Sequence, residues 1–145
     1  MAVSLGDAAW AELLELYHGR VREALERHRG ALMDTAGDGF FAVFDEVEDA
    51  IRCALDIRLR ALRLGLDVRS GIHFGHCWLA DAKCAGSDVH VGARLASGAA
   101  PGEVLISEEA ALQAQRAGID LADRGLRSLK GLPGARRVYA VGRRP

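Results

Sequence analysis

The chain is poor in cysteine and balanced in charge, and both facts exclude classes of protein. Its three cysteines, Cys53, Cys77 and Cys84, are too few and too irregularly spaced for a disulfide framework or a zinc ribbon. The 19 basic and 20 acidic residues give a formal net charge of −1, which argues against a nucleic-acid partner held by bulk charge. We therefore expect a protein of a reducing compartment, the cytoplasm.

Long apolar runs are also missing. No stretch approaches the length of a membrane span, and the N-terminus lacks the basic-then-apolar order of a signal peptide. Internal repeats, low-complexity tracts and linkers are absent as well. With 145 residues that are 50% hydrophobic, the chain is long enough for one domain with a real core over residues 1–145, and we expect it to be soluble.

What the chain does contain is a short apolar hairpin with a carboxylate at its tip. Residues 31–45 read ALMDTAGDGFFAVFD, and the glycines Gly37 and Gly39 on both sides of Asp38 allow a tight turn. Three of the chain's four phenylalanines follow in the return strand, so we expect this strand to be buried on at least one face. Simple turn chemistry would also explain Asp38, since Asp-Gly is common in hairpin turns.

Helical and strand patterns alternate over the rest of the chain. Asp7 is placed to cap a helix that Gly30 ends, and Asp45 with Glu48 reads as the capping box of a second helix that ends at Gly65. Further helices are predicted at about 88–97 and, with Ser107 as its cap, up to Ala117. Strands are predicted at 67–79, 103–106, 121–129 and 137–141. Because the connections include hairpins, the pattern predicts an α+β fold with helices on one face of the sheet rather than a parallel doubly wound sheet.

One spacing resembles a metal site. His73 and His76 are three residues apart and Cys77 follows directly. Side chains three apart on a strand point to opposite faces, so the predicted strand disfavours a shared metal ion.

Four further segments carry a family resemblance. TAGDGFFAVF, VRSGIHFGH, GSDVHVGARLASGAAPGEVLIS and DRGLRSLKGLPGARRVYAV occur in the order and spacing of the catalytic domain of class III adenylate/guanylate cyclases. LGDAAWAELLELYHGRVREAL looks like that family's first helix, so the resemblance covers essentially the whole chain. It implies a ferredoxin-like core, a head-to-tail homodimer or a heterodimer with another cyclase domain, and formation of a cyclic nucleotide from ATP or GTP.

The resemblance also implies a pair of Mg²⁺ or Mn²⁺ ions held by two aspartates, because ring closure needs cations on the attacking and leaving oxygens. Asp38 matches the aspartate of the GDGF turn. The other family aspartate lies on an apolar strand that would precede Val3, and this sequence begins after it. We expect a gap or an open edge in the sheet at that place, and weak or absent turnover by this chain alone.

The same resemblance assigns roles to residues that contact the substrate. Asp34 and Lys83 fall where the family has a purine-reading lysine and its acidic partner, so the two charges are exchanged. The exchanged pair could form a salt bridge that presents a different pattern to the base, or both positions could have drifted.

Three cationic or titratable residues match family positions. Arg94 matches the arginine that stabilises the phosphates and the transition state, and His90 precedes it by one helical turn, where some bacterial relatives also have histidine. Lys130 resembles the lysine that reaches the triphosphate. Without the resemblance, Arg94 and Lys130 would read equally well as ordinary surface charge.

Three functions are compatible with this pattern. The first is a class III-type cyclase, a phosphorus–oxygen lyase, whose missing strand and aspartate another subunit could supply. The second is a non-catalytic signalling module that dimerises or binds nucleotide, and the third is a ferredoxin-like interaction domain without a ligand. Retention of Asp38, Arg94 and Lys130 favours the second over the third.

Overall fold

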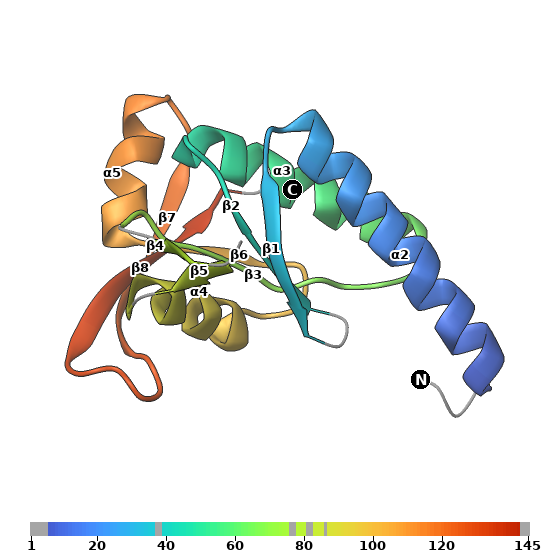
Figure 1. The fold of residues 1–145 in the computed structure, drawn as a ribbon. Coiled ribbons are helices and arrows are strands. Elements are labelled where there is room, and N and C mark those ends of the chain that lie inside the picture. Colours follow the sequence, from blue (N-terminus) through green and yellow to red (C-terminus); the bar gives the residue numbers. More distant parts are fainter. Residues whose placement is uncertain (1–5, 37–38, 76–77, 81–82, 86, 143–145) are drawn as a thin grey trace.

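A computed structural model of the chain describes residues 6–36, 39–75, 78–80, 83–85 and 87–142 (Figure 1). The helices are α2 (Asp7–Arg27), α3 (Val47–Arg63), α4 (Ser87–Gly98) and α5 (Glu108–Arg116). The strands are β1 (Ala31–Ala36), β2 (Gly39–Val43), β3 (Ser70–Ile72), β4 (Trp78–Ala80), β5 (Lys83–Ala85), β6 (Val104–Ser107), β7 (Leu121–Ser128) and β8 (Ala135–Val141). None of the helices in these ranges is long and apolar enough to cross a bilayer.

The main sheet has four strands in the order β3-β6-β8-β7. β3 pairs with β6 in parallel, whereas β6–β8 and β8–β7 are antiparallel. The fold is therefore α+β with mostly antiparallel pairing, as the sequence predicted.

Both faces of this sheet are covered, which differs from the predicted single covered face. All four residues of β6 are buried. Val104 and Ile106 pack with α3 and α5, and Leu105, which points to the opposite face, packs with Val91 and Leu95 of α4. The apolar face of α4 is what closes the second side of the sheet (Figure 1).

β1 and β2 form the predicted antiparallel hairpin, but as a separate two-stranded sheet. Ala36 pairs with Gly39, so only two residues lie between the strands, and Asp38 at this turn lies outside the described residues. Phe40 on β2 and Phe44 directly after it pack against the core between α2 and α3. One face of the return strand is therefore turned to the core, but it is half-buried, because none of residues 40–44 is fully buried.

The first two helices start without the side-chain caps that the sequence predicted. Gly6 is the N-cap of α2, with Asp7 already in the first turn, and Glu46 is the N-cap of α3; neither makes a side-chain cap bond. Glu48 instead accepts hydrogen bonds from Arg52, at 3.0 Å and 2.6 Å, one turn along the same helix. A charged partner at i+4 has displaced the weaker bond to the helix terminus.

Gly30 has a packing role in place of the predicted left-handed terminus. Arg29 takes the positive φ, 64°, and Gly30 N–H donates to Leu25 O at 2.8 Å. A Cβ on Gly30 would lie 2.6 Å from the ring of Phe44 and 2.8 Å from Leu25 Cδ2. Glycine at this position lets the hairpin approach the end of α2 closely.

The predicted strand 67–79 is broken into two short strands. Only β3 joins the main sheet, where Ile72 pairs with Ile106, and β4 pairs with β5 in a separate hairpin. β6 passes into α5 directly after Ser107, so the residues beyond Ile72 have no further β6 backbone beside them with which to pair. A strand pattern without a neighbouring backbone cannot extend a sheet.

An ion-pair network joins α2 to α3. Asp56 Oδ2 lies 3.0 Å from His28 Nε2, while Arg60 donates to Asp56 Oδ1 at 2.9 Å and to Glu23 Oε1 at 2.8 Å. Burial by itself would raise the pKa of Asp56, but the hydrogen bonds from Arg60 and His28 outweigh it and hold that pKa below its ordinary value. The network fixes the angle between the two helices that cover the hairpin.

Candidate functional site

α4 has one buried apolar face and one exposed face with polar side chains. Val91 and Leu95 are 2% and 1% exposed and hold the helix on the sheet. His90 and Arg94 are both exposed and lie one helical turn apart, so they share the outer face. The buried residues therefore decide where these two side chains point.

The turn after β7 brings a second cation to the same place. Leu129 is buried with α4's apolar face, and Leu132 packs against the same cluster, so the turn between them is anchored on α4. Gly131 adopts φ +81°, a left-handed conformation that favours glycine. Arg94 Nη2 lies 3.9 Å from the position that a Cβ on Gly131 would take, and exposed Lys130 is the adjacent residue.

Neither Arg94 nor Lys130 has a hydrogen-bond or ion-pair partner within the described part of the chain. Two unpaired cations held at one turn produce a local positive potential that favours an anion with several oxygens. A guanidinium can bind a phosphate in a bidentate manner, and an ammonium adds a mobile point charge. The arrangement can therefore hold a phosphate chain.

The contact between α4 and β3 is unusually close. A Cβ on Gly71 would overlap the backbone atoms Gly92 O and Ala96 N and would lie 2.8 Å from Leu95 Cβ. Glycine at position 71 thus permits helix and strand backbones to touch. This contact sets the height of α4, and with it the position of Arg94, above the sheet.

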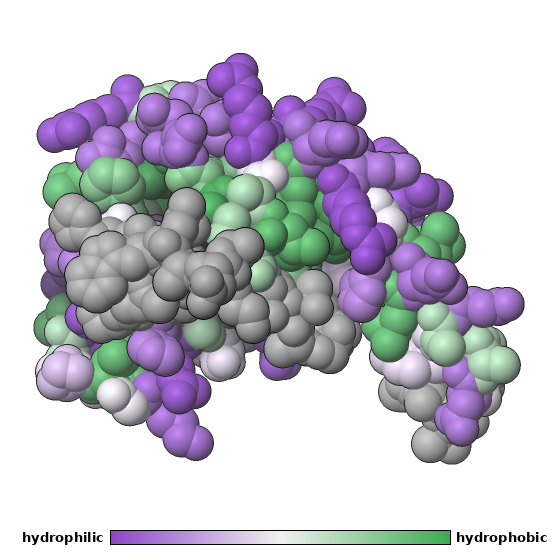
Figure 2. Space-filling view, viewed as in Figure 1, coloured by the Kyte–Doolittle hydropathy of each residue, from purple (hydrophilic) through white to green (hydrophobic). Residues whose placement is uncertain are grey.

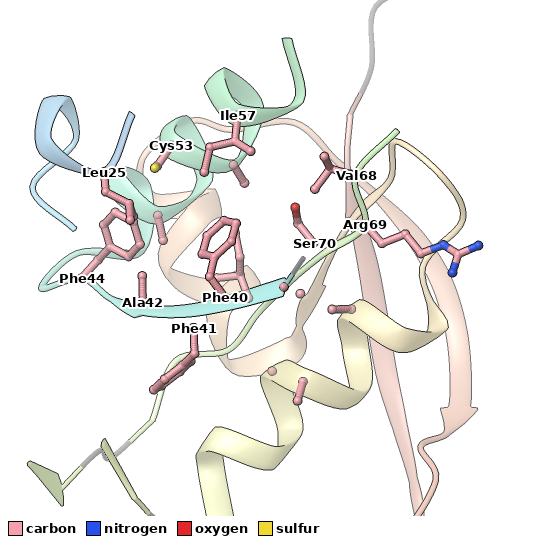
Figure 3. Close-up of a pocket in the computed structure, with 18 of the residues that line it drawn as sticks. Leu25, Phe40, Phe41, Ala42, Phe44, Cys53, Ile57, Val68, Arg69 and Ser70 are labelled. Carbon is pink, nitrogen blue, oxygen red and sulfur yellow. The ribbon is translucent and has the colours of Figure 1, made fainter. Parts of the chain in front are cut away.

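A cavity of about 890 Å³ separates β2 from β3; we call it the slot. Figure 3 shows Phe40 between β2 and α3, Val68 and Ser70 across the opening, and Phe41 on the other face of β2. Figure 2 shows hydrophobic residues reaching this side of the molecule, with hydrophilic residues above them. The slot is the gap that divides the hairpin from the main sheet.

His73, at the end of the slot, has a structural partner. Its Nδ1 lies 2.7 Å from Ser107 Oγ, and Ser107 Oγ also accepts from Ala110 N at 3.2 Å as the N-cap of α5. His76 and Cys77 lie outside the described residues. The contact gives His73 a role in joining β3 to α5.

Comparison with known proteins relates this geometry to a family. No family model matches the chain. The uncharacterized protein Rv0891c of Mycobacterium tuberculosis (strain ATCC 25618 / H37Rv) is 35% identical over 118 residues, which cover 78% of this chain. The chain spans 41% of the length of this relative.

Two solved structures superpose on most of the chain. An adenylate/guanylate cyclase/hydrolase from Silicibacter pomeroyi matches with a TM-score of 0.77 and 28% identity over 88% of this chain and 81% of its own. The adenylyl cyclase CyaB from P. aeruginosa matches with a TM-score of 0.87 and 22% identity over 99% of this chain and 87% of its own. The chain has the fold of the class III nucleotide cyclase catalytic domains.

On this cyclase fold, the residues predicted to contact the base lie on adjacent strands. Asp34 belongs to β1 and Lys83 to β5, and these two strands contact each other. The structure describes the backbone at both positions and not the two side chains. The backbone arrangement is compatible with the predicted Asp34–Lys83 pair, which stays a prediction.

Within the described residues, the structure contains no complete donor set for a pair of metal ions. Asp38, the one carboxylate that the sequence matched to a metal ligand, lies outside the described residues. Over the rest of the chain that the structure describes, no group of three or more His, Cys, Asp or Glu side chains could hold a metal ion. A single carboxylate is a poor match for two hard dications, so the described residues do not fit a two-ion centre.

The sequence indicated the cations but not what positions them. Arg94, His90 and Lys130 were selected by resemblance, and the structure places Arg94 beside the turn that begins at Lys130. Gly71, whose contact with α4 positions Arg94, was missed. A glycine inside a strand pattern was the signal for close backbone approach at position 71.

Proposed function

We propose that this chain is a cyclase-like domain that binds the triphosphate of ATP or GTP through Arg94 and Lys130 and, by itself, turns it over weakly or not at all. The observation that carries the proposal is the position of the Arg94 guanidinium beside the Lys130–Gly131 turn. The cyclase fold of the solved relatives supports a nucleotide as the anion.

Charge explains why both cations would matter. A nucleoside triphosphate presents several anionic oxygens in a row, and each charge-assisted hydrogen bond contributes about 1.5–3 kcal/mol. Loss of one such bond weakens binding by about 10–100-fold, since 1.4 kcal/mol corresponds to a factor of ten. His90, on the same outer face as Arg94, would contact the nucleotide beside it.

Turnover is expected to be limited by the metal ligands. In the cyclase reaction a divalent ion neutralises charge on the phosphates when it is bound. Of the residues in this sequence, Asp38 alone is matched to a ligand of such an ion. A domain that retains the cations but only half of the carboxylates would hold nucleotide better than it converts it.

Nucleotide binding is tested by thermal unfolding with ATP or GTP in the presence of Mg²⁺ or Mn²⁺. We expect a rise in Tm, because a ligand that binds the folded state stabilises it. Arg94→Ala and Lys130→Ala should each remove most of the rise, whereas Arg22→Ala, an exposed arginine on α2, should leave it unchanged. An equal response of all three variants would mean that the triphosphate does not bind at this turn.

Turnover is tested on the same samples by measuring cyclic AMP or cyclic GMP. Binding without product supports the nucleotide-binding module. Clear formation of cyclic nucleotide that disappears in Asp38→Ala would refute the predicted weak turnover and support the hypothesis that the chain is an enzyme. The expected homodimer or heterodimer is checked separately, by sedimentation of the protein with and without nucleotide.

A further inference from the structure

A second cavity lies on the outer surface where α2 and α3 pack along each other. It is an open groove of about 870 Å³, lined by residues of these two helices and by the residues that directly follow them. Glu23 meets Arg60 and His28 meets Asp56, so the two helices run antiparallel. We call this surface the α2–α3 groove.

The α2–α3 groove has an excess of positive charge. Its lining contains five arginines against two carboxylates, those of Glu23 and Asp56. Both carboxylates already have partners within the groove. Arg60 donates to Glu23 at 2.8 Å and to Asp56 at 2.9 Å, and His28 lies 3.0 Å from Asp56. The internal ion pairs therefore leave the excess of arginine available to an anion from outside.

Two of these arginines have no partner. Arg27 and Arg63 are exposed and make no hydrogen bond or ion pair with any residue that the structure describes. Arg27 lies near the level of Asp56, which its neighbour His28 contacts, and the helix rises about 10 Å from Asp56 to Arg63. Leu59 lies between these levels and is 54% exposed. The groove thus presents two cations about two helical turns apart, with an apolar side chain between them.

We propose that the α2–α3 groove binds an acidic amphipathic helix of a partner protein, with two carboxylates on Arg27 and Arg63 and a leucine on Leu59. Residues seven apart on a helix lie on the same face and about 10 Å apart, which matches the separation of the two arginines. Burial of an apolar helix face in a groove is a common mode of peptide recognition. The proposal holds whether or not the domain binds or converts a nucleotide.

An acidic helix fits this surface better than a small anion or a lipid surface does. A single phosphate cannot reach two guanidinium groups about 10 Å apart, and it would leave Leu59 in water. A bilayer surface is flat on this scale, whereas the arginines and Leu59 line a groove. A helix supplies both charges and the apolar contact from one face.

The test uses the full chain and a fluorescein-labelled synthetic helix of about 15 residues, built on alanine, with two glutamates seven residues apart and a leucine between them. Fluorescence anisotropy at low salt gives its Kd. Arg63→Glu should raise Kd at least about tenfold, because repulsion replaces attraction. A second peptide, with lysine in place of one glutamate, should bind Arg63→Glu about as tightly as the first peptide binds the parent protein.

Two further variants separate the groove from general attraction between opposite charges. Leu59→Ser should raise Kd about tenfold, since it removes the apolar contact and leaves the charges in place. Arg116→Glu, at an exposed arginine on α5 outside the groove lining, should leave Kd unchanged. Arg63 and Leu59 are exposed, so the circular dichroism of their variants should match that of the parent protein.

Five results would overturn the proposal. The first is no saturable binding of the acidic helix, and the second is failure of the lysine peptide to restore binding to Arg63→Glu. An equal effect of Arg116→Glu would show attraction between opposite charges without a site. Binding to phosphatidylserine vesicles that Arg63→Glu abolishes, without binding of the peptide, would assign the groove to an anionic membrane. A dimer that sedimentation detects and that Arg63→Glu dissociates would assign it to a second copy of this chain.

Discussion

Replacing Gly71 with alanine perturbs the contact that holds α4 on β3. The added Cβ would overlap Gly92 O and Ala96 N, and these are backbone atoms of a helix that cannot rotate away. The clash is relieved only if α4 moves off the strand. Because Val91 and Leu95 of α4 are buried against the sheet, that movement also opens the core between helix and sheet.

The loss of stability in Gly71→Ala can be estimated from the known cost of inserting extra atoms into a packed core. Inserting a methyl group into a tight core costs about 1–3 kcal/mol, and rigid neighbours place Gly71→Ala near 3 kcal/mol. For a chain of this length, each kcal/mol lowers Tm by about 2–4 °C, so Tm should fall by roughly 6–12 °C. The assay is thermal unfolding followed by circular dichroism, with nucleotide binding measured well below Tm, where we expect weaker binding because Arg94 moves with α4.

Gly92→Ala is the matched control, because it adds a methyl group on the other side of the same contact. Its nearest neighbour would be Gly71 O at 3.9 Å, an ordinary van der Waals distance. Alanine is about 0.8–1.0 kcal/mol better than glycine inside a helix, so this variant should be as stable as the parent or more so. A Gly71→Ala protein that keeps its Tm, or a Gly92→Ala protein that loses as much, would refute the close-contact account.

Three further outcomes are expected. Ser107→Ala removes the oxygen that accepts from Ala110 N, so urea unfolding should show a loss of about 0.5–2 kcal/mol, and unchanged stability would contradict the capping role. Burial alone would raise the pKa of Asp56, but the hydrogen bonds and charges of Arg60 and His28 together lower it, so Asp56→Asn should lower the free energy of unfolding at pH 7 and shrink its loss between pH 7 and pH 3. The stability from such a group is present above its unfolded pKa of about 3.9 and is lost as pH falls through the lower folded value; parallel pH profiles for the two proteins would contradict this. Burial, and then the charge of Asp56, raise the pKa of Cys53 from 9.0 to about 12, which lowers its thiolate fraction at pH 8 about a thousandfold. In a variant whose other cysteines are serine, iodoacetamide at pH 8 should therefore modify Cys53 far more slowly than a free thiol, and rapid modification would contradict that burial.

Local sequence patterns were enough to predict the elements that depend on local physics. The glycines around Asp38 and the apolar residues that follow predicted the hairpin, because turn geometry and strand periodicity are both encoded within a dozen residues. Ser107 was correctly predicted to cap α5, since its hydroxyl lies at the start of a helical pattern and no competing partner is close in sequence. The cyclase resemblance then supplied the fold class.

Of the features that sequence did not predict, one depends on a choice between local partners and the others depend on residues distant in the chain. Glu48 looked like half of a capping box but pairs with Arg52, a choice between two local partners that propensity does not decide. The extended pattern after Ile72 ended because β6 turns into α5, more than thirty residues later. Coverage of both sheet faces required knowing that Leu105 and Val91 meet, which is a tertiary contact.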